Sequence, residues 1–498
     1  IARQDQIQYG YACLLRDLDH YQEALEHAED AVRLAPDNPE FCYLAADLAN
    51  SLLYEERAYH LLNVDRLLHI DQEQKQSFLD CYGLAIEMLL SRNDLPHADS
   101  LLATVGEYVE SEPRLLAASS RIHLRKGGHE TARHELDLAL SMLKSRETDA
   151  ATEVLPLWIG VAEIEFSNWK FGMDILKSLA RTHPNHPGIQ VEYLRSLVKA
   201  AETSLDAQMV RCEKHLPPME LLERDGFDEF HQTLAALDRY SKIEEVQRWR
   251  VRGMAAFRPT PTNLKALHSL PMVEDDPAAL ARGLRISENQ AHVFELTERY
   301  PASPELLFQL VLSSPAVEMN HVWEFARKLL EIVDCNPVYL AGVALLAERA
   351  GLLEDAEEAI TEAVRIWNDE PGWHAWAAEL NEKLSDFEEA NVHWKLAVQL
   401  SPSNINYLLR LAYSLVQIGE TNSAIEVLDS AKMENETRFE IYEMLALIYL
   451  KLEKYQEALV CAQQFNQLDG GSTRSLVQIG RICLKMERFD LALQYAQQ

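Results

Sequence analysis

Small residues recur along this chain at a fixed interval of 34 positions. In the C-terminal part, one alanine keeps its place in successive segments: Ala356, Ala390, Ala424, Ala458 and Ala492. Twelve positions earlier, each segment carries a second small residue: Ala344, Ala378, Ala412, Ala446 and Gly480. A repeat at this period predicts an array of similar units rather than one large globular core.

The same interval is present near the N-terminus, where it is interrupted by two slips. Ala24 and Ala58 are 34 positions apart, and so are Ala98 and Ala132. Six extra residues separate these two pairs, and six more lead to Gly172. The N-terminal part is therefore expected to contain the same unit in a less regular form.

Each unit reads as two short helices joined by a polar turn. Leu408, Leu411 and Leu415 recur at helical spacing, IGET follows at 418–421, and a second amphipathic segment contains Ala424. Antiparallel helices approach closely only where small side chains meet, so we expect Ala412 to contact Ala424. One such pair cannot cover its own apolar face, and successive pairs must therefore stack.

The segments around the turns are similar to a known family. LRLAYSLVQIGETNSAIEVLDSA (409–431) and LALIYLKLEKYQEALVCA (445–462) resemble the tetratricopeptide repeat, and the resemblance covers most of residues 5–198 and 303–498. It implies an all-α fold, an α-α superhelix of stacked antiparallel helix pairs. The proline that usually ends the second helix is present as Pro36, Pro184 and Pro402, whereas Glu436 and Gly470 replace it elsewhere.

The regularity of the repeat divides the sequence into three segments. We expect an N-terminal block at 1–198, an irregular helical middle segment at 199–302, and a regular C-terminal block at 303–498. The middle segment is rich in proline, and Pro259–Thr262 is its best predicted linker or kink. It is either a junction between two superhelical blocks or a partner-binding insertion, and we favour the junction.

Composition limits the partners and the compartment. The formal net charge of −32 repels phosphate backbones, so we expect no nucleic-acid partner. The seven cysteines are scattered without a CxxC pair, which is typical of a reducing compartment, and we expect a cytoplasmic location. No apolar run approaches 18 residues, so no membrane span is predicted. Residue 1 is not Met, and we expect the chain to be part of a longer protein.

The motifs of common enzyme classes are absent from the sequence. We find no GxxxxGK[ST] or GxGxxG phosphate loop and no GxSxG nucleophile elbow. HETARH at 129–134 spaces its histidines five apart, whereas a helical zinc site needs four. The tryptophans Trp367, Trp373, Trp376 and Trp394 are expected in the core. We therefore expect no enzyme, no cofactor and no metal site.

A partner is expected on the concave wall that the first helices of the pairs form. Stepping by 34 residues places six candidate partner-binding residues there: Glu379, Arg410, Tyr413, Glu443, Gln478 and Arg481. One subset of the family holds acidic chaperone tails with a clamp of lysines, asparagines and an arginine, and only Arg410 fits that pattern. Because Glu379, Glu440 and Glu443 fall on this wall, we expect a protein or peptide partner that is basic or neutral.

Three classes of function remain open at this point. The leading hypothesis is a protein-binding scaffold or adaptor that uses the concave surface of the superhelix. The alternative is the regulatory or sensor arm of a longer multidomain enzyme whose catalytic domain lies outside this chain. A self-contained enzyme is the least favoured, because no constellation of catalytic residues is present.

Overall fold

The computed structural model describes most of the chain, and every element in the described residues is a helix. The described ranges are 4–62, 74–92, 94–126, 128–145, 154–165, 168–214, 216, 226–270, 276–287, 291–300, 304–313, 323, 326–327, 329–330 and 336–497. Contacts between Cα atoms divide the chain into two compact units. The first unit comprises residues 1–212 and 218–339, and the second comprises 213–217 and 340–498. The all-α fold expected from the periodicity is thus confirmed.

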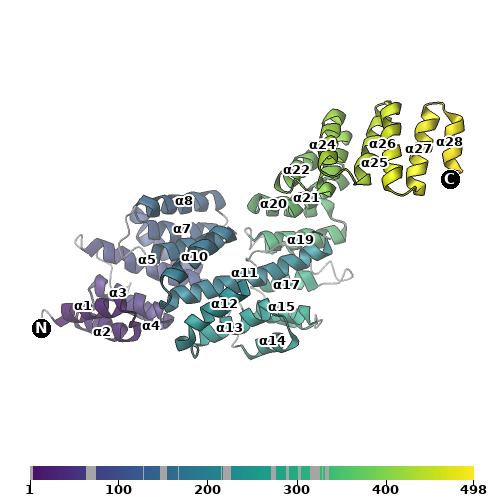
Figure 1. Cartoon of the computed structure of the whole chain (residues 1–498). Coiled ribbons are helices and arrows are strands. Elements are labelled where there is room, and N and C mark those ends of the chain that lie inside the picture. Colours follow the sequence, from purple (N-terminus) through teal and green to yellow (C-terminus); the bar gives the residue numbers. More distant parts are fainter. Residues whose placement is uncertain are drawn as a thin grey trace. The chain divides into compact units, whose positions relative to one another are not determined.

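The first unit contains the N-terminal repeats and the middle helices (Figure 1). Its repeat helices are α1 (Gln4–Asp17), α2 (Tyr21–Leu34), α3 (Pro39–Ser51), α4 (Glu55–Leu62), α5 (Lys75–Ser91), α6 (Leu95–Thr104), α7 (Pro113–Arg125), α8 (His129–Ser145), α9 (Val154–Glu165) and α10 (Trp169–Thr182). They are followed by α11 (Pro187–Glu213), α12 (Gly226–Ala236), α13 (Glu244–Phe257), α14 (Pro261–Ala266), α15 (Asp276–Ile286), α16 (Ala291–Arg299) and α17 (Pro304–Ser313). Short 3₁₀ helices are present at Gly106–Ser111, Asp238–Tyr240 and Leu267–Ser269.

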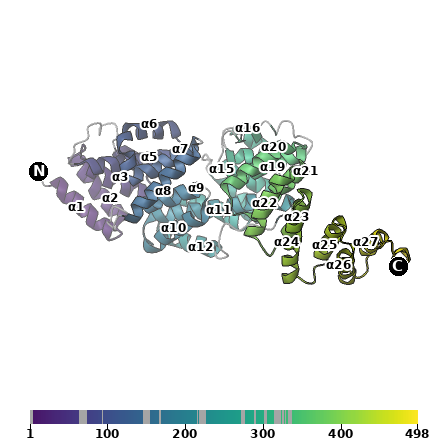
Figure 2. The same cartoon turned by 90° about the horizontal axis from the view of Figure 1, so that it is seen from above.

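The second unit is a row of antiparallel helix pairs, visible in both views (Figures 1 and 2). Its elements are α19 (Pro337–Ala350, which begins in the first unit), α20 (Leu353–Ile366), α21 (Pro371–Lys383), α22 (Phe387–Leu400), α23 (Ile405–Gln417), α24 (Thr421–Glu434), α25 (Phe439–Lys451), α26 (Tyr455–Leu468), α27 (Thr473–Lys485) and α28 (Phe489–Ala496). From α21 to α28 the second helix of each pair packs on the first, and α20, α22, α24 and α26 each contact the first helix of the next pair. This arrangement buries an apolar face that one pair alone would expose.

The turns inside the pairs share one backbone feature that follows the repeat. A residue just after the first helix has positive φ at Gly351, Ser385, Gly419, Glu453 and Glu487, each 34 positions after the last. Asp19 and Leu53 repeat the feature in the first unit. The left-handed conformation ends the first helix and satisfies its last carbonyl groups, as the bond from Lys454 N–H to the Tyr449 carbonyl shows.

Small residues lie at the helix crossings, as the sequence predicted. Ala412 of α23 and Ala424 of α24 are fully buried in one core cluster with Leu411 and Leu428. In the less regular N-terminal part, Gly160 and Gly172 take the same places. A Cβ on Gly172 would lie 2.7 Å from the Gly160 carbonyl oxygen. Close approach of the two helices therefore depends on the absence of larger side chains.

Ion pairs join the middle helices to each other inside the first unit. Asp206 of α11 is almost fully buried and accepts hydrogen bonds from Arg282 at 2.7 Å, Arg285 at 3.1 Å and Gln309 at 3.0 Å. On the preceding turn of α11, Glu202 accepts a hydrogen bond from Arg252 at 2.7 Å. Helix α11 passes through residue 198 without interruption, and the predicted linker at Pro259–Thr262 separates α13 from α14. The three-segment division of the sequence stays a prediction.

The structure can be compared with three further expectations from the sequence, on the tryptophans, on the histidines of HETARH and on membrane spans. Trp373, Trp376 and Trp394 are at most 1% exposed and Trp367 is 9% exposed, which confirms that they belong to the core. Pro217 and the side chain of His129 lie outside the described residues. Among the helices that the structure describes, none combines the length and the apolar character that a membrane crossing requires.

Candidate partner-binding surface

One position of the repeat can be compared between the two units. It is the residue eleven positions before the small residue of the second helix, and we call it the inner row. In the second unit the inner row consists of Leu345, Glu379, Tyr413, Leu447 and Arg481, and in the first unit it includes Asp47, Glu87 and Arg121. All of these positions are described, so their surroundings can be compared directly.

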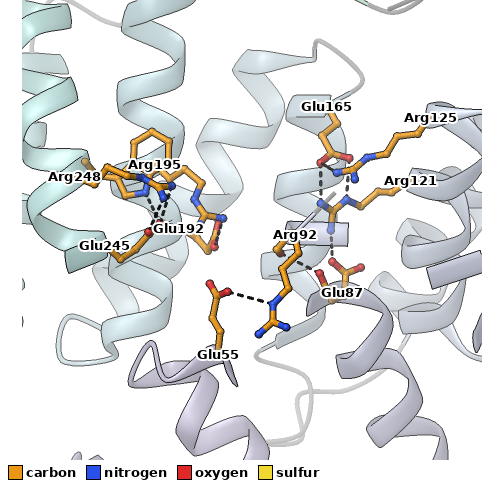
Figure 3. A network of polar contacts seen from close by, with 12 residues as sticks. Glu55, Glu87, Arg92, Arg121, Arg125, Glu165, Glu192, Arg195, Glu245 and Arg248 are labelled. Carbon is orange, nitrogen blue, oxygen red and sulfur yellow. Dashed lines mark hydrogen bonds and ion pairs between the residues drawn. The ribbon is translucent and has the colours of Figure 1, made fainter. Parts of the chain in front are cut away.

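In the first unit the inner row is filled by an ion-pair network (Figure 3). Arg121 of α7 is 3% exposed and pairs with Glu87 of α5. Its guanidinium also binds both carboxylate oxygens of Glu165 from α9, at 2.8 and 2.7 Å. Arg125 donates to the same carboxylate at 3.0 Å. Neighbouring first helices are thereby held together by their own side chains, and the wall is closed to a partner at this level.

The charges of this network set the pKa values of its carboxyl groups. Burial raises the pKa of Glu87 to about 7, although the positive charge of Arg121 opposes this effect. Burial alone would also raise the pKa of Glu165. The guanidiniums of Arg121 and Arg125 outweigh it and hold the pKa of Glu165 well below its usual range. Two turns earlier on the helix, Arg114 donates hydrogen bonds to Tyr43 at 2.8 Å and to Asp80 at 3.0 Å.

Contacts between distant segments close the first unit further. Ser51 Oγ lies 3.4 Å from His186 Nε2, and Asn185 donates to Asp19 at 2.8 Å. Leu53 packs into a cluster with Leu194 of α11 and with other buried residues that include Val191, Phe230 and Trp249. The turn before α11 is therefore docked on the ends of α1 and α3. A cleft of about 490 Å³ beside this contact is lined by residues of both charges, among them Glu56, Arg57, Glu244 and Arg248.

In the second unit the inner row is buried at Leu345 of α19 and open to solvent from α21 onward. Tyr413 is 36% exposed and Leu447 is 41% exposed, and Arg481 is also exposed. The Glu379 side chain is 38% exposed, and its carboxylate lies 4.0 Å from Lys214 Nζ. From α21 onward this repeat position therefore presents an apolar and charged surface, whereas Glu87 and Arg121 of the first unit are buried and ion-paired at it.

The other three predicted residues differ in their exposure. Arg410 is exposed, and it pairs with Glu382 at 3.2 Å and lies over the ring of Trp394. Glu443 is only 9% exposed, because its carboxylate contacts the side chain of Arg474 at 2.5 Å. Gln478 is 7% exposed and donates to the Glu443 carbonyl oxygen at 3.1 Å. The structure thus brings Arg410, Tyr413 and Arg481 to the surface, while Glu443 and Gln478 lie beneath it.

Sequence reasoning missed three exposed cations on the same helices. Lys451, Arg474 and Lys485 are exposed on α25 and α27. Stepping by 34 residues from Gln417 leads to Lys451 and Lys485, so the periodicity contained the signal for these two. Within the described ranges, no three His, Cys, Asp or Glu side chains gather as a metal ion would require.

Comparison with known families agrees with this architecture. The family model described as tetratricopeptide repeat matches residues 5–38, which form the pair α1–α2. The family model described as anaphase-promoting complex, cyclosome, subunit 3 matches residues 383–465. Both matches fall on helix pairs that keep the 34-residue period. The chain contains tetratricopeptide repeats. This confirms the resemblance found in the sequence, and the fold is one that serves protein–protein interaction.

Several solved structures are similar to this tetratricopeptide-repeat protein at low identity. MamA 41-end from Desulfovibrio magneticus RS-1 is 17% identical, with 32% of this chain and 91% of that chain covered and a TM-score of 0.30. The APC/C hetero-tetramer Cut9-Hcn1 is 14% identical, with 99% and 86% covered and a TM-score of 0.34. YrrB, a TPR protein with an unusual peptide-binding site, is 14% identical, with 37% and 95% covered and a TM-score of 0.33. Comparison with curated proteins gives no match.

Proposed function

We propose that this tetratricopeptide-repeat protein is a non-catalytic scaffold or adaptor. It holds a protein partner on the inner face of α21, α23, α25 and α27. One observation carries this proposal: Glu87 and Arg121 of the inner row are buried by ion pairs in the first unit, whereas Tyr413, Leu447 and Arg481 of the same row are exposed in the second. The predicted site residues Glu379, Arg410, Tyr413 and Arg481 belong to this face, with Glu443 and Gln478 supporting it from below. A cytoplasmic location stays a prediction.

The chemistry of the exposed row suits a protein surface. Tyr413 contacts Phe387 edge-on at 6.4 Å between ring centroids, which restricts its ring while leaving part of it open. Leu447 lies one repeat further along the wall. A restricted aromatic and an aliphatic side chain side by side give a partner apolar anchors at a small cost in conformational entropy.

A pair of matched substitutions tests the proposal. Leu447→Asp places a charge in the exposed inner row, and Val392→Asp places one on the second helix α22, where Val392 is 48% exposed. Partners captured by the unmodified chain from its native source are identified by mass spectrometry, and their affinity for both variants is then measured. We expect Leu447→Asp to weaken a directly bound partner at least about tenfold and Val392→Asp to leave it unchanged. Equal affinity for both variants contradicts the proposal.

A further inference from the structure

Charge is distributed unevenly between the two helices of each pair in the second unit. The first helices α23, α25 and α27 carry five cations and two carboxylates: Arg410, Lys451, Arg474, Arg481 and Lys485, against Glu440 and Glu443. The second helices α24, α26 and α28 carry one cation and five carboxylates: Lys432 against Glu426, Asp429, Glu434, Glu457 and Asp490. In a chain of net charge −32, the inner face of these three pairs is therefore locally positive.

Burial increases this difference, because the acids are covered more than the bases. Glu443 is 9% exposed and paired with Arg474, whose side chain remains 72% exposed. Glu382, which pairs with Arg410, has a side chain only 8% exposed, whereas that of Arg410 is 45% exposed. The solvent on this face therefore meets guanidinium and ammonium groups, and the carboxylates mainly orient them.

The exposed cations flank the apolar anchors in a regular strip. Arg410 lies three residues before Tyr413 on α23, and Lys451 lies four residues after Leu447 on α25. Lys485 lies four residues after Arg481 on α27. Residues three or four apart share one face of a helix, so each helix adds a pair to the same strip. We call these six residues the basic strip.

We propose that the basic strip binds an acidic protein segment in which aspartate or glutamate flanks an aliphatic or aromatic side chain. The inference rests on the proposed function and specifies the charge of the partner. Ion pairs between the basic strip and the acidic segment attract at short range. Repulsion from the remaining carboxylates of the chain is screened beyond about 8 Å at physiological ionic strength. Of the glutamates that favoured a basic or neutral partner in the sequence, Glu443 is paired with Arg474, and the carboxylate of Glu379 lies 4.0 Å from Lys214 Nζ.

Selection from a random 12-residue peptide library on the full chain tests the inference. Affinities of the selected peptides are then compared for three variants whose helicity and melting are checked first. Arg481→Glu with Lys485→Glu reverses two charges of the strip, and Leu447→Asp disrupts its apolar centre. Lys395→Glu with Lys432→Glu reverses two charges on the second helices α22 and α24 as the control.

We expect the selected peptides to be acidic with an apolar residue, and to lose at least about tenfold in affinity with the strip variants but not with the control. Basic or neutral peptides that are lost with Leu447→Asp overturn the acidic partner and leave the proposed function standing. Peptides that bind all variants equally overturn both proposals. Both are also overturned if the unmodified chain enriches no peptide that the Leu447→Asp variant does not enrich equally.

Discussion

His186 holds the closed end of the first unit, and it does so as a neutral imidazole. His186 directly precedes α11, and its Nδ1 accepts a hydrogen bond from the Ile189 N–H at 3.3 Å. Nε2 therefore carries the proton and faces Ser51 Oγ at 3.4 Å. Burial and the nearby His183 lower the pKa of His186 to about 4, while Asp19 opposes the shift. The imidazole thus caps the start of α11 and also joins this helix to α3.

The first prediction is an acid sensitivity that this histidine causes. Because its pKa is lower when folded, the unfolded chain takes up the proton first. Its stabilisation is fully present above about pH 7 and is lost as the pH falls from about 6.5 to about 4, by up to about 3 kcal/mol. Hydrogen exchange of the first turn of α11, corrected for intrinsic rates, measures the loss of protection.

His186→Asn is the matched control for this prediction. Asparagine accepts the same bond from the Ile189 N–H at the start of the helix but does not titrate in this range. We expect its protection to change less between pH 7 and pH 4.5 than that of the unmodified chain. An identical pH dependence in both proteins rules out His186 as the source.

The second prediction concerns the left-handed turn residues. Glu453 has φ of 60°, whereas glycine occupies the same place at Gly351 and Gly419. A side chain at such a φ costs about 1–2 kcal/mol, and glycine recovers part of this while adding entropy to the unfolded chain. Glu453→Gly is expected to stabilise the second unit by about 0.5–1 kcal/mol in urea unfolding. Glu457→Gly, in the first turn of α26, should instead destabilise it by up to about 1 kcal/mol, and the opposite order contradicts the turn assignment.

At the scale of helices, the third prediction tests the crossing of a pair. Ala458 of α26 is fully buried against α25, whereas Gln463 on the same helix is exposed. Ala458→Leu is expected to overpack the crossing and destabilise the second unit by about 1–3 kcal/mol. Gln463→Leu should change the free energy of unfolding by less than about 0.5 kcal/mol. Equal effects of the two substitutions in urea unfolding are incompatible with the predicted crossing.

The fourth prediction concerns the ion pairs between first helices. Arg121→Met leaves Glu87 buried without its cation, and Glu165 keeps only Arg125. Loss of one partner of a buried pair typically costs about 3–5 kcal/mol, which should appear in the unfolding of the first unit. Adding Glu87→Gln to this variant should recover part of the loss, because the buried charge is then removed. No recovery in the double variant would show that Arg121 acts through packing alone.

Periodicity predicted the helix pairs because it reports what each residue does within one repeat. Ala412, Ala424 and Ala458 could be placed at crossings since only small side chains fit there. It could not predict that Glu443 is covered, because the arginine that covers it belongs to the next helix pair. Nor could it distinguish Glu87 from Leu447, which share one repeat position, since Glu87 is covered by Arg121 of the next first helix.

At the scale of the whole molecule, one repeat position is closed at Glu87 and Arg121 in the first unit and open to a partner at Tyr413 and Leu447 in the second. Sealing comes from Arg121 and its carboxylates, whereas openness leaves Tyr413 and Leu447 at the surface. Both units contain helix pairs of the same kind. The two walls therefore differ in their side chains and not in the backbone of the repeat.

Hydroxyl-radical footprinting of the intact chain, with and without a bound partner, tests this claim most directly. Tyr82 of α5 is 1% exposed in the core of the first unit and Tyr413 is 36% exposed, which gives one tyrosine in each unit. We predict that Tyr413 and Leu447 are modified in the free chain and protected by the partner, while Tyr82 stays unmodified throughout. Modification of Tyr82 at the rate of Tyr413, or a bound partner that leaves Tyr413 and Leu447 unprotected, would contradict the account.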